Sequence, residues 1–200
     1  MQGPIPIEKL ECLFALLTPD GFKKPTACVA SGRPTLFTLD QIKDYIDIHR
    51  FVKLMAFTLM PNHFHLAVFN LTSSGLAQYM HKVITAYTKY INAKYGRSGH
   101  LFQGSYQRVR VDSDDQLAYL SAYIHRNQRD LPGWCDREQD YPWSSYLDYV
   151  SENRFDLLLD TAPILELSRS RADYHEYVKK SGAKDRAPSE LLIDLDFAPI

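Results

Sequence analysis

The sequence predicts an α+β fold with a βαββαβ core, in which two helices cover one face of an antiparallel sheet. Two neighbouring β-rich segments, 51–60 and 63–70, are separated by a Pro-Asn turn and predict a hairpin. The segment 74–95 has apolar residues at helical spacing, and a second helical segment follows residue 112. This arrangement is that of ferredoxin-like and RRM-like domains, here followed by a C-terminal helical tail.

The first part of the predicted core is the least regular, because prolines interrupt its short apolar runs. Either Leu10–Leu17 or Ala27–Phe37 can supply the first strand. A helix is expected to begin at Thr38 or Asp40, either of which can cap its first turn. The hairpin follows, with Phe51–Met60 as its first strand.

The second half of the core contains a strand between two helices. The helix at Ser74–Tyr95 ends in a glycine-rich loop, whose glycines permit positive φ angles. In Ser105–Val111 the residue types alternate between two faces, which predicts a strand with Tyr106, Arg108 and Arg110 on one face. The next helix is capped by the acidic run that starts at Asp112.

The C-terminal part is expected to pack as short helices. Trp134–Tyr149 is rich in aromatic residues and predicts a packed loop that leads into a short helix. A last helix is expected near Ser168–Lys180, followed by a polar tail.

Composition limits the class of protein. Among 200 residues, 45% are hydrophobic and 24% charged, which is typical of a globular domain and excludes a mostly disordered chain. No apolar run approaches the roughly 20 residues that span a bilayer, and no signal peptide is recognised, so a cytoplasmic protein without a membrane partner is expected. The three cysteines are too far apart to suggest a disulfide framework or a cysteine zinc site.

The net charge of −1 hides a strong segregation of charge. Residues 48–111 contain eight Lys or Arg and no acidic residue, whereas residues 112–200 contain ten against eighteen. An acid-free basic segment is typical of a surface that binds a phosphate backbone, although a solvated positive face is the alternative. The candidate DNA-binding residues are Lys82, Lys89, Lys94, Arg97, His100, Tyr106, Arg108 and Arg110.

Four residues suggest a reaction centre. On a strand, His63 and His65 project to the same side, so two imidazoles can converge on one point. On a helix, Tyr123 and Asn127 are one turn apart and share a face. Each pair alone is a weak signal, because strand histidines and half-buried helical tyrosines are usually structural.

The chain resembles the single-tyrosine HUH transposases, especially the REP-associated tyrosine transposases. Four motifs in order carry the resemblance, over roughly residues 38–150: Leu59-Met-Pro-Asn-His-Phe-His-Leu66, the segment from Ala86 to Gly104, Tyr119–Asn127, and Asp140-Tyr-Pro-Trp-Ser-Ser-Tyr146.

The resemblance implies a mechanism and a domain division. His63, His65 and Asn127 would hold a divalent cation, Mg²⁺ or Mn²⁺, and Tyr123 would be the nucleophile that becomes linked to a 5′ phosphate of single-stranded, hairpin-associated DNA. Residues 1–150 would form the transposase domain and 151–200 a helical extension and tail. Relatives include dimers and monomers, so a homodimer with Tyr123 acting in either subunit remains open.

The sequence departs from the family pattern at two places, and three other functions are alternatives. The Arg-Gly-Asn-like turn usual after the first strand is not found before Leu36, and Gln128 stands where Pro usually follows the asparagine. A nucleic-acid-binding module without catalysis is the main alternative. A histidine-dependent nucleotide hydrolase would need a third alternating histidine where Ala67 stands, and an amidohydrolase barrel would need a longer chain.

Overall fold

The computed structural model describes residues 50–183, which divide into two compact units. One unit contains Leu54–Val68 and residues 100–183, and the other contains residues 50–53 and Phe69–Gly99. The expected first strand and the helix expected at Thr38 lie outside the described residues.

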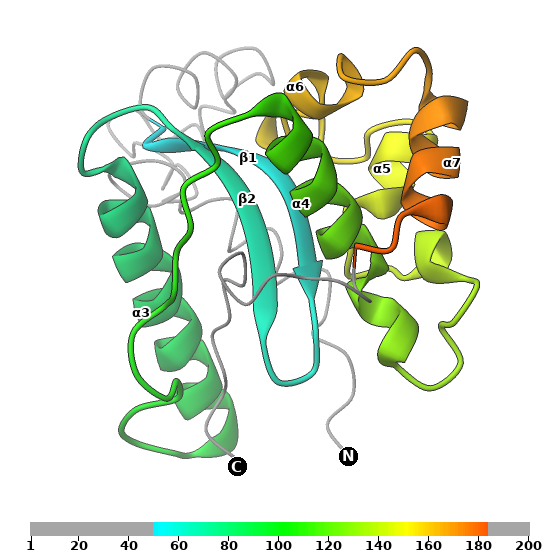
Figure 1. The fold of residues 1–200 in the computed structure, drawn as a ribbon. Helices are drawn as coiled ribbons and strands as arrows, with labels where there is room; N and C mark the ends of the chain where they lie inside the picture. The colour runs from blue at the N-terminus through cyan, green and yellow to red at the C-terminus, as the bar shows by residue number, and fades with distance from the viewer. Residues whose placement is uncertain (1–49, 184–200) are drawn as a thin grey trace, which may run out of the picture. The chain divides into compact units, whose positions relative to one another are not determined.

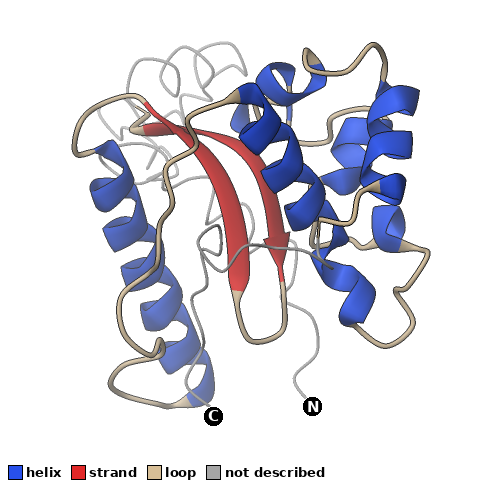
Figure 2. Cartoon of the chain, in the orientation of Figure 1, coloured by secondary structure: helices blue, strands red, loops and turns tan. Residues whose placement is uncertain are grey.

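The central hairpin consists of β1 (Val52–Leu59) and β2 (Phe64–Asn70), which are the strands drawn in Figure 2. The N–H of Met60 donates to the carbonyl of His63 at 2.8 Å and closes the turn. The predicted hairpin is therefore confirmed to within one residue at each end, and the described residues form an α+β structure.

The segment 143–149, which has no regular strand structure, makes further hydrogen bonds to backbone groups of β1. The N–H of Ser145 donates to the carbonyl of Phe57 at 2.9 Å, and the N–H of Leu59 donates to the carbonyl of Trp143 at 2.8 Å. The hydroxyl of Tyr149 donates to the carbonyl of Met55 at 2.6 Å. These contacts occupy backbone groups that would otherwise remain open to another strand.

The prediction of a strand at Ser105–Val111 is wrong. Within residues 50–183 no backbone hydrogen bond joins this segment to another, so it lacks the ladder that defines a strand. Arg108 and Arg110 are exposed, and Tyr106 is half-buried. Alternation of side chains also occurs in an extended surface segment, and here it does not indicate a sheet. The described residues therefore do not confirm the full βαββαβ core.

Helix α4 (Asp114–Arg126) begins where the sequence indicates. The side chain of Ser113 accepts a hydrogen bond from the N–H of Gln116 at 3.2 Å, and two acidic residues occupy the positive end of the helix dipole. Its buried residues include Leu120 and Ile124, which pack in the main core cluster with residues of β1.

Shorter helices follow α4 in this unit, and Figure 1 labels α5, α6 and α7 among them. They are η1 (Asn127–Asp130), η2 (Glu138–Asp140), α5 (Tyr146–Val150), η3 (Asp156–Leu158), α6 (Ala162–Leu165) and α7 (Arg171–Lys180). The predicted aromatic loop with its short helix and the predicted last helix are both confirmed. None of the helices described between residues 50 and 183 has the length and apolar character needed to cross a bilayer.

In the other unit, α3 (Gly75–Tyr95) confirms the predicted long helix. Met80, Val83 and Ile91 are buried along one face. Gly96 ends the helix in the left-handed conformation with φ of 60°, as the glycine-rich loop predicts.

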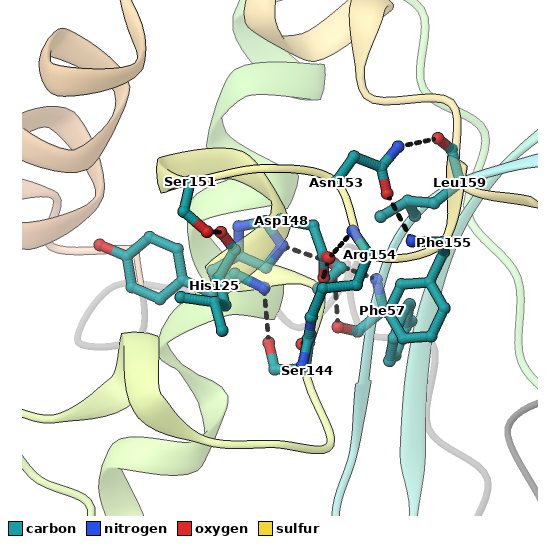
Figure 3. A network of polar contacts seen from close by, with 12 residues as sticks. Phe57, His125, Ser144, Asp148, Ser151, Asn153, Arg154, Phe155 and Leu159 are labelled. Atoms are coloured by element: carbon teal, nitrogen blue, oxygen red, sulfur yellow. Dashed lines mark hydrogen bonds and ion pairs between the residues drawn. The ribbon is translucent and has the colours of Figure 1, made fainter. Parts of the chain in front are cut away.

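A partly buried ion pair links α5 to the segment that follows it. Figure 3 shows the carboxylate of Asp148, which is fully buried, bound by the guanidinium of Arg154 through bonds of 2.9 Å and 2.8 Å. Arg154 also donates to the carbonyl of Ser144 at 3.0 Å. The pairing satisfies a carboxylate that has no access to solvent.

Replacing Arg154 with alanine should leave the Asp148 carboxylate buried without its cation and reduce the free energy of unfolding by about 3 kcal/mol. Urea denaturation at pH 7 measures this loss. The double variant Asp148→Asn with Arg154→Ala should recover part of it. Equal stability of Arg154→Ala and the wild type would show that the pair contributes nothing.

Candidate active site

The hairpin places two histidines side by side. The ring centroids of His63 and His65 are 4.8 Å apart, with an angle of 75° between the planes. His65 is 3% exposed and His63 is half-buried. The period of two along a strand thus brings the imidazoles together at the turn end of β2.

Asn62 orients one of these rings, a role that the sequence did not suggest because Asn62 reads as an ordinary turn residue. Its side-chain oxygen lies 2.8 Å from Nδ1 of His63. Since an amide oxygen only accepts, Nδ1 of His63 is the donor in this contact, and in the neutral ring Nε2 is then the nitrogen with the lone pair. Metal-binding histidines are typically fixed in this way by a partner on the second ring nitrogen.

Helix α4 brings the candidate nucleophile to the same place. The ring centroid of Tyr123 lies 5.4 Å from that of His65, with an angle of 77° between the planes. Tyr123 is 9% exposed and belongs to the core cluster, which fixes its ring. The structure therefore gathers His63 and His65, and Tyr123 about sixty positions further along the chain, into one row of ring contacts.

Asn127 follows Tyr123 by one helical turn. It ends α4 in helical geometry, with φ of −58° and ψ of −38°, and is 3% exposed. An amide oxygen with two imidazole nitrogens is a mixed donor set that suits Mn²⁺ and accommodates Mg²⁺. The separation of the two histidine rings is compatible with metal–nitrogen bonds of about 2.1 Å to one ion.

Over the described part of the chain, no group of three or more His, Cys, Asp or Glu residues could hold a metal ion. The candidate site has two histidines, His63 and His65, and its third ligand is the amide of Asn127, which is not among these four residue types. A cation at this site would consequently keep most of its charge and several open positions.

Tyr119 precedes Tyr123 by one turn and is the other tyrosine on this side of α4. Its hydroxyl donates to the carbonyl of Ala183 at 2.6 Å, and Ala183 is fully buried. This contact gives Tyr119 a structural role at the end of the chain segment after α7. The geometry therefore favours Tyr123 over Tyr119 as the nucleophile.

His125 lies between Tyr123 and Asn127 in sequence but faces the protein interior. Its Nδ1 is 2.7 Å from the hydroxyl of Tyr174, and its ring stacks on Tyr146 at 5.1 Å. Complete burial lowers the pKa of His125 to about 3. The imidazole is thus neutral in the folded protein at neutral pH.

The lowered pKa of His125 predicts acid sensitivity. Between pH 6.5 and about 3 the unfolded chain binds a proton at His125 that the folded protein does not, so stability is complete above pH 6.5 and declines below it. His125 lowers the free energy of unfolding by at most about 1.4 kcal/mol for each unit that the pH falls in this range. Urea denaturation at pH 7.5, 6.0 and 5.0 should show this decline.

The matched variant is His125→Gln, which removes the titrating group. Although less stable at pH 7.5, it should show a smaller decline over the same pH range. An identical decline in both proteins would show that His125 does not cause it.

The candidate DNA-binding residues lie in both units. In the first, His100, Arg108 and Arg110 are exposed and Tyr106 is half-buried. Arg110 also pairs with Asp112 at 2.6 Å. In the second, Lys82, Lys89 and Lys94 belong to α3, where Lys89 is exposed, and Arg97 lies in the loop that follows.

Arg108 and Arg110 make a testable pair of candidates for phosphate contact. Each replacement with alanine should weaken binding to single-stranded DNA and reduce the slope of log Kd against log salt by about 0.7 per lost contact. The larger change is expected for Arg108, because Asp112 already compensates part of the charge of Arg110. Filter binding between 50 and 300 mM salt would measure the slopes, and unchanged slopes would exclude contact with the backbone.

Comparisons with known proteins gave one family match. Searches of the curated proteins and of the solved structures found no match for the chain. Residues 32–127 match the model of a family described as "Transposase IS200 like". The matched region contains His63, His65, Tyr123 and Asn127, and the match supports the transposase family for this chain.

Proposed function

We propose that this protein is a metal-dependent, single-tyrosine transposase that cuts and rejoins single-stranded DNA. The observation that carries the proposal is the row of ring contacts that joins His63, His65 and Tyr123. Asn127, one turn from the tyrosine, supplies the third ligand of the cation. The transposase family match supports the same reading.

In the proposed reaction, the phenol oxygen of Tyr123 attacks a backbone phosphorus. A bond forms between this oxygen and phosphorus, the bond from phosphorus to the 3′ oxygen breaks, and the phenol proton is lost while the 3′ oxygen gains one. A divalent cation, when bound, supplies charge stabilisation at the phosphate and its leaving oxygen. The products are a 5′-phosphotyrosine and a free 3′ hydroxyl.

The reverse of this reaction would rejoin DNA strands. A 3′ hydroxyl attacks the phosphotyrosine, restores a phosphodiester and releases Tyr123, so no bond energy is lost and no nucleoside triphosphate is required. The buried position of Tyr123 holds the ring in one orientation for both steps. Hairpin-associated DNA is the substrate that we propose, and a homodimer is one of two assemblies compatible with it.

One observation favours the alternative of a binding module without catalysis. Tyr123 is only 9% exposed, as expected of a core aromatic residue. In that case His63, His65 and Tyr123 would stabilise the hairpin against α4, and the basic segment alone would bind nucleic acid. The two functions differ in whether a covalent product forms.

A covalent-capture experiment tests the proposed function. The protein is incubated with a library of single-stranded oligonucleotides, each containing a hairpin with random flanks, in the presence of Mn²⁺ or Mg²⁺. The transposase should give DNA-linked protein that survives denaturing electrophoresis, and sequencing of the linked DNA should identify the preferred flank. Chelator should abolish the product. Binding without any adduct in either metal would establish the module instead.

A further inference from the structure

A closed hydrogen-bond network ties the last turn of α4 to β1. The hydroxyl of Thr58 donates to the side-chain oxygen of Gln128 at 3.1 Å. The amide nitrogen of Gln128 donates to the carbonyl of His125 at 2.8 Å and to that of Glu138 at 2.9 Å. Thr58, Gln128 and His125 are fully buried. The oxygen and both N–H groups of the Gln128 amide therefore have partners.

A second connection runs from His125 through Ser145 to Phe57, the residue before Thr58 in β1. Nε2 of His125 is 2.8 Å from the hydroxyl of Ser145. That hydroxyl accepts from the N–H of Phe57 at 2.9 Å and donates to its carbonyl at 3.2 Å. Phe57 and Thr58 are adjacent in β1, so the two connections form one ring, which we name the α4 clamp: Phe57, Thr58, His125, Gln128 and Ser145.

The proton directions in the clamp are mutually consistent. With the hydroxyl proton of Ser145 donated to the carbonyl of Phe57, the tautomer of His125 that completes the network donates from Nε2 to Ser145. Nδ1 then accepts from the hydroxyl of Tyr174 on α7. Every polar group has a partner in a fully buried site, and such networks hold a unique arrangement because each broken bond leaves an unsatisfied group.

Two clamp residues flank the candidate ligand Asn127 in sequence, because His125 precedes it by two residues and Gln128 follows it directly. We propose that His125 and Gln128 are positioning residues, which fix the last turn of α4 so that Tyr123 and Asn127 face the two histidines of the hairpin. This inference rests on the proposed function. The clamp touches neither DNA nor metal and acts only through the placement of α4.

The sharpest variants break the bond between Thr58 and Gln128, either from β1 or from η1, and leave the residues of α4 unchanged. Thr58→Val keeps the shape of the side chain but removes the donor to Gln128, whereas Thr58→Ser keeps the hydroxyl. Gln128→Met removes the same connection from the other side. Asn153→Ala is the matched control, because it removes hydrogen bonds to the carbonyls of Asp156 and Leu159, neither of which belongs to the clamp.

The experiment measures single-turnover cleavage at saturating DNA, its dependence on Mn²⁺ concentration, and DNA affinity, all at a temperature where each variant is folded. Thr58→Val and Gln128→Met should lower the rate by about 10-fold and raise the Mn²⁺ concentration for half-maximal rate, with unchanged DNA affinity. Thr58→Ser and Asn153→Ala should match the wild type. Wild-type rates in Thr58→Val and Gln128→Met, or an equal loss in Asn153→Ala, would overturn the proposal.

An NMR measurement separates this inference from the proposed function. Nuclear Overhauser contacts between the rings of His65 and Tyr123 should be present in the wild type and weakened in Gln128→Met. If the wild type forms no covalent adduct but these contacts behave as expected, the proposed reaction fails and the positioning role stands. If the contacts are unchanged in Gln128→Met, the positioning role fails whatever the activity.

Discussion

Tyr123→Phe should abolish strand cleavage, with a loss of rate on the order of 10³ or more, because the substitution removes the attacking oxygen and nothing else. The phenylalanine ring can keep the contact with His65 and the burial in the core cluster. Stability and DNA affinity should therefore change little. Denaturing electrophoresis with labelled DNA measures the loss.

Tyr119→Phe is the matched control on the same helix. It removes a hydroxyl that binds the carbonyl of Ala183 and should cost about 1 kcal/mol of stability while cleavage continues. The reverse pattern, in which Tyr119→Phe stops cleavage and Tyr123→Phe does not, would move the nucleophile to Tyr119. Cleavage in both variants would indicate water or another residue.

His65→Phe should remove metal-dependent cleavage. Phenylalanine preserves an aromatic ring between His63 and Tyr123 but has no nitrogen to bind a cation. The expected loss exceeds the roughly 10- to 100-fold typical of residues that only support a ligand. His63→Ala should behave in the same way, and the measurement is cleavage rate over a Mn²⁺ titration.

His81→Ala provides the control for loss of an imidazole, because His81 is exposed on α3. It should leave the Mn²⁺ titration unchanged. Full activity of His65→Phe, or wild-type cleavage in the presence of excess chelator, would contradict a metal role for the histidine pair.

Sequence patterns predicted the elements whose signals are local. The hairpin follows from two β-rich segments around a Pro-Asn turn, and α4 follows from the cap at Ser113 with acidic residues behind it. The proximity of His63 and His65 needs only the period of a strand. The contact between His65 and Tyr123 needed the tertiary fold, and only the family resemblance suggested it beforehand.

Long-range polar contacts could not be predicted in this way. Thr58 and Gln128 are 70 positions apart, and Phe57 and Ser145 are 88 apart, so no local pattern marks them. The segment Ser105–Val111 failed for the opposite reason: its alternation is a local signal, but a strand also requires a partner for its backbone. Gln128, noted as a departure from the family sequence, proved to be a fully buried hydrogen-bonding residue.

Mass spectrometry of the captured adduct tests the central claim most directly. The covalent DNA–protein product is trimmed with nuclease and protease, and the modified residue is identified by fragmentation of the peptide. The account predicts one modified residue, Tyr123, carrying a 5′-linked nucleotide. A nucleotide on any other residue, or metal-dependent cleavage without a covalent peptide, would contradict it.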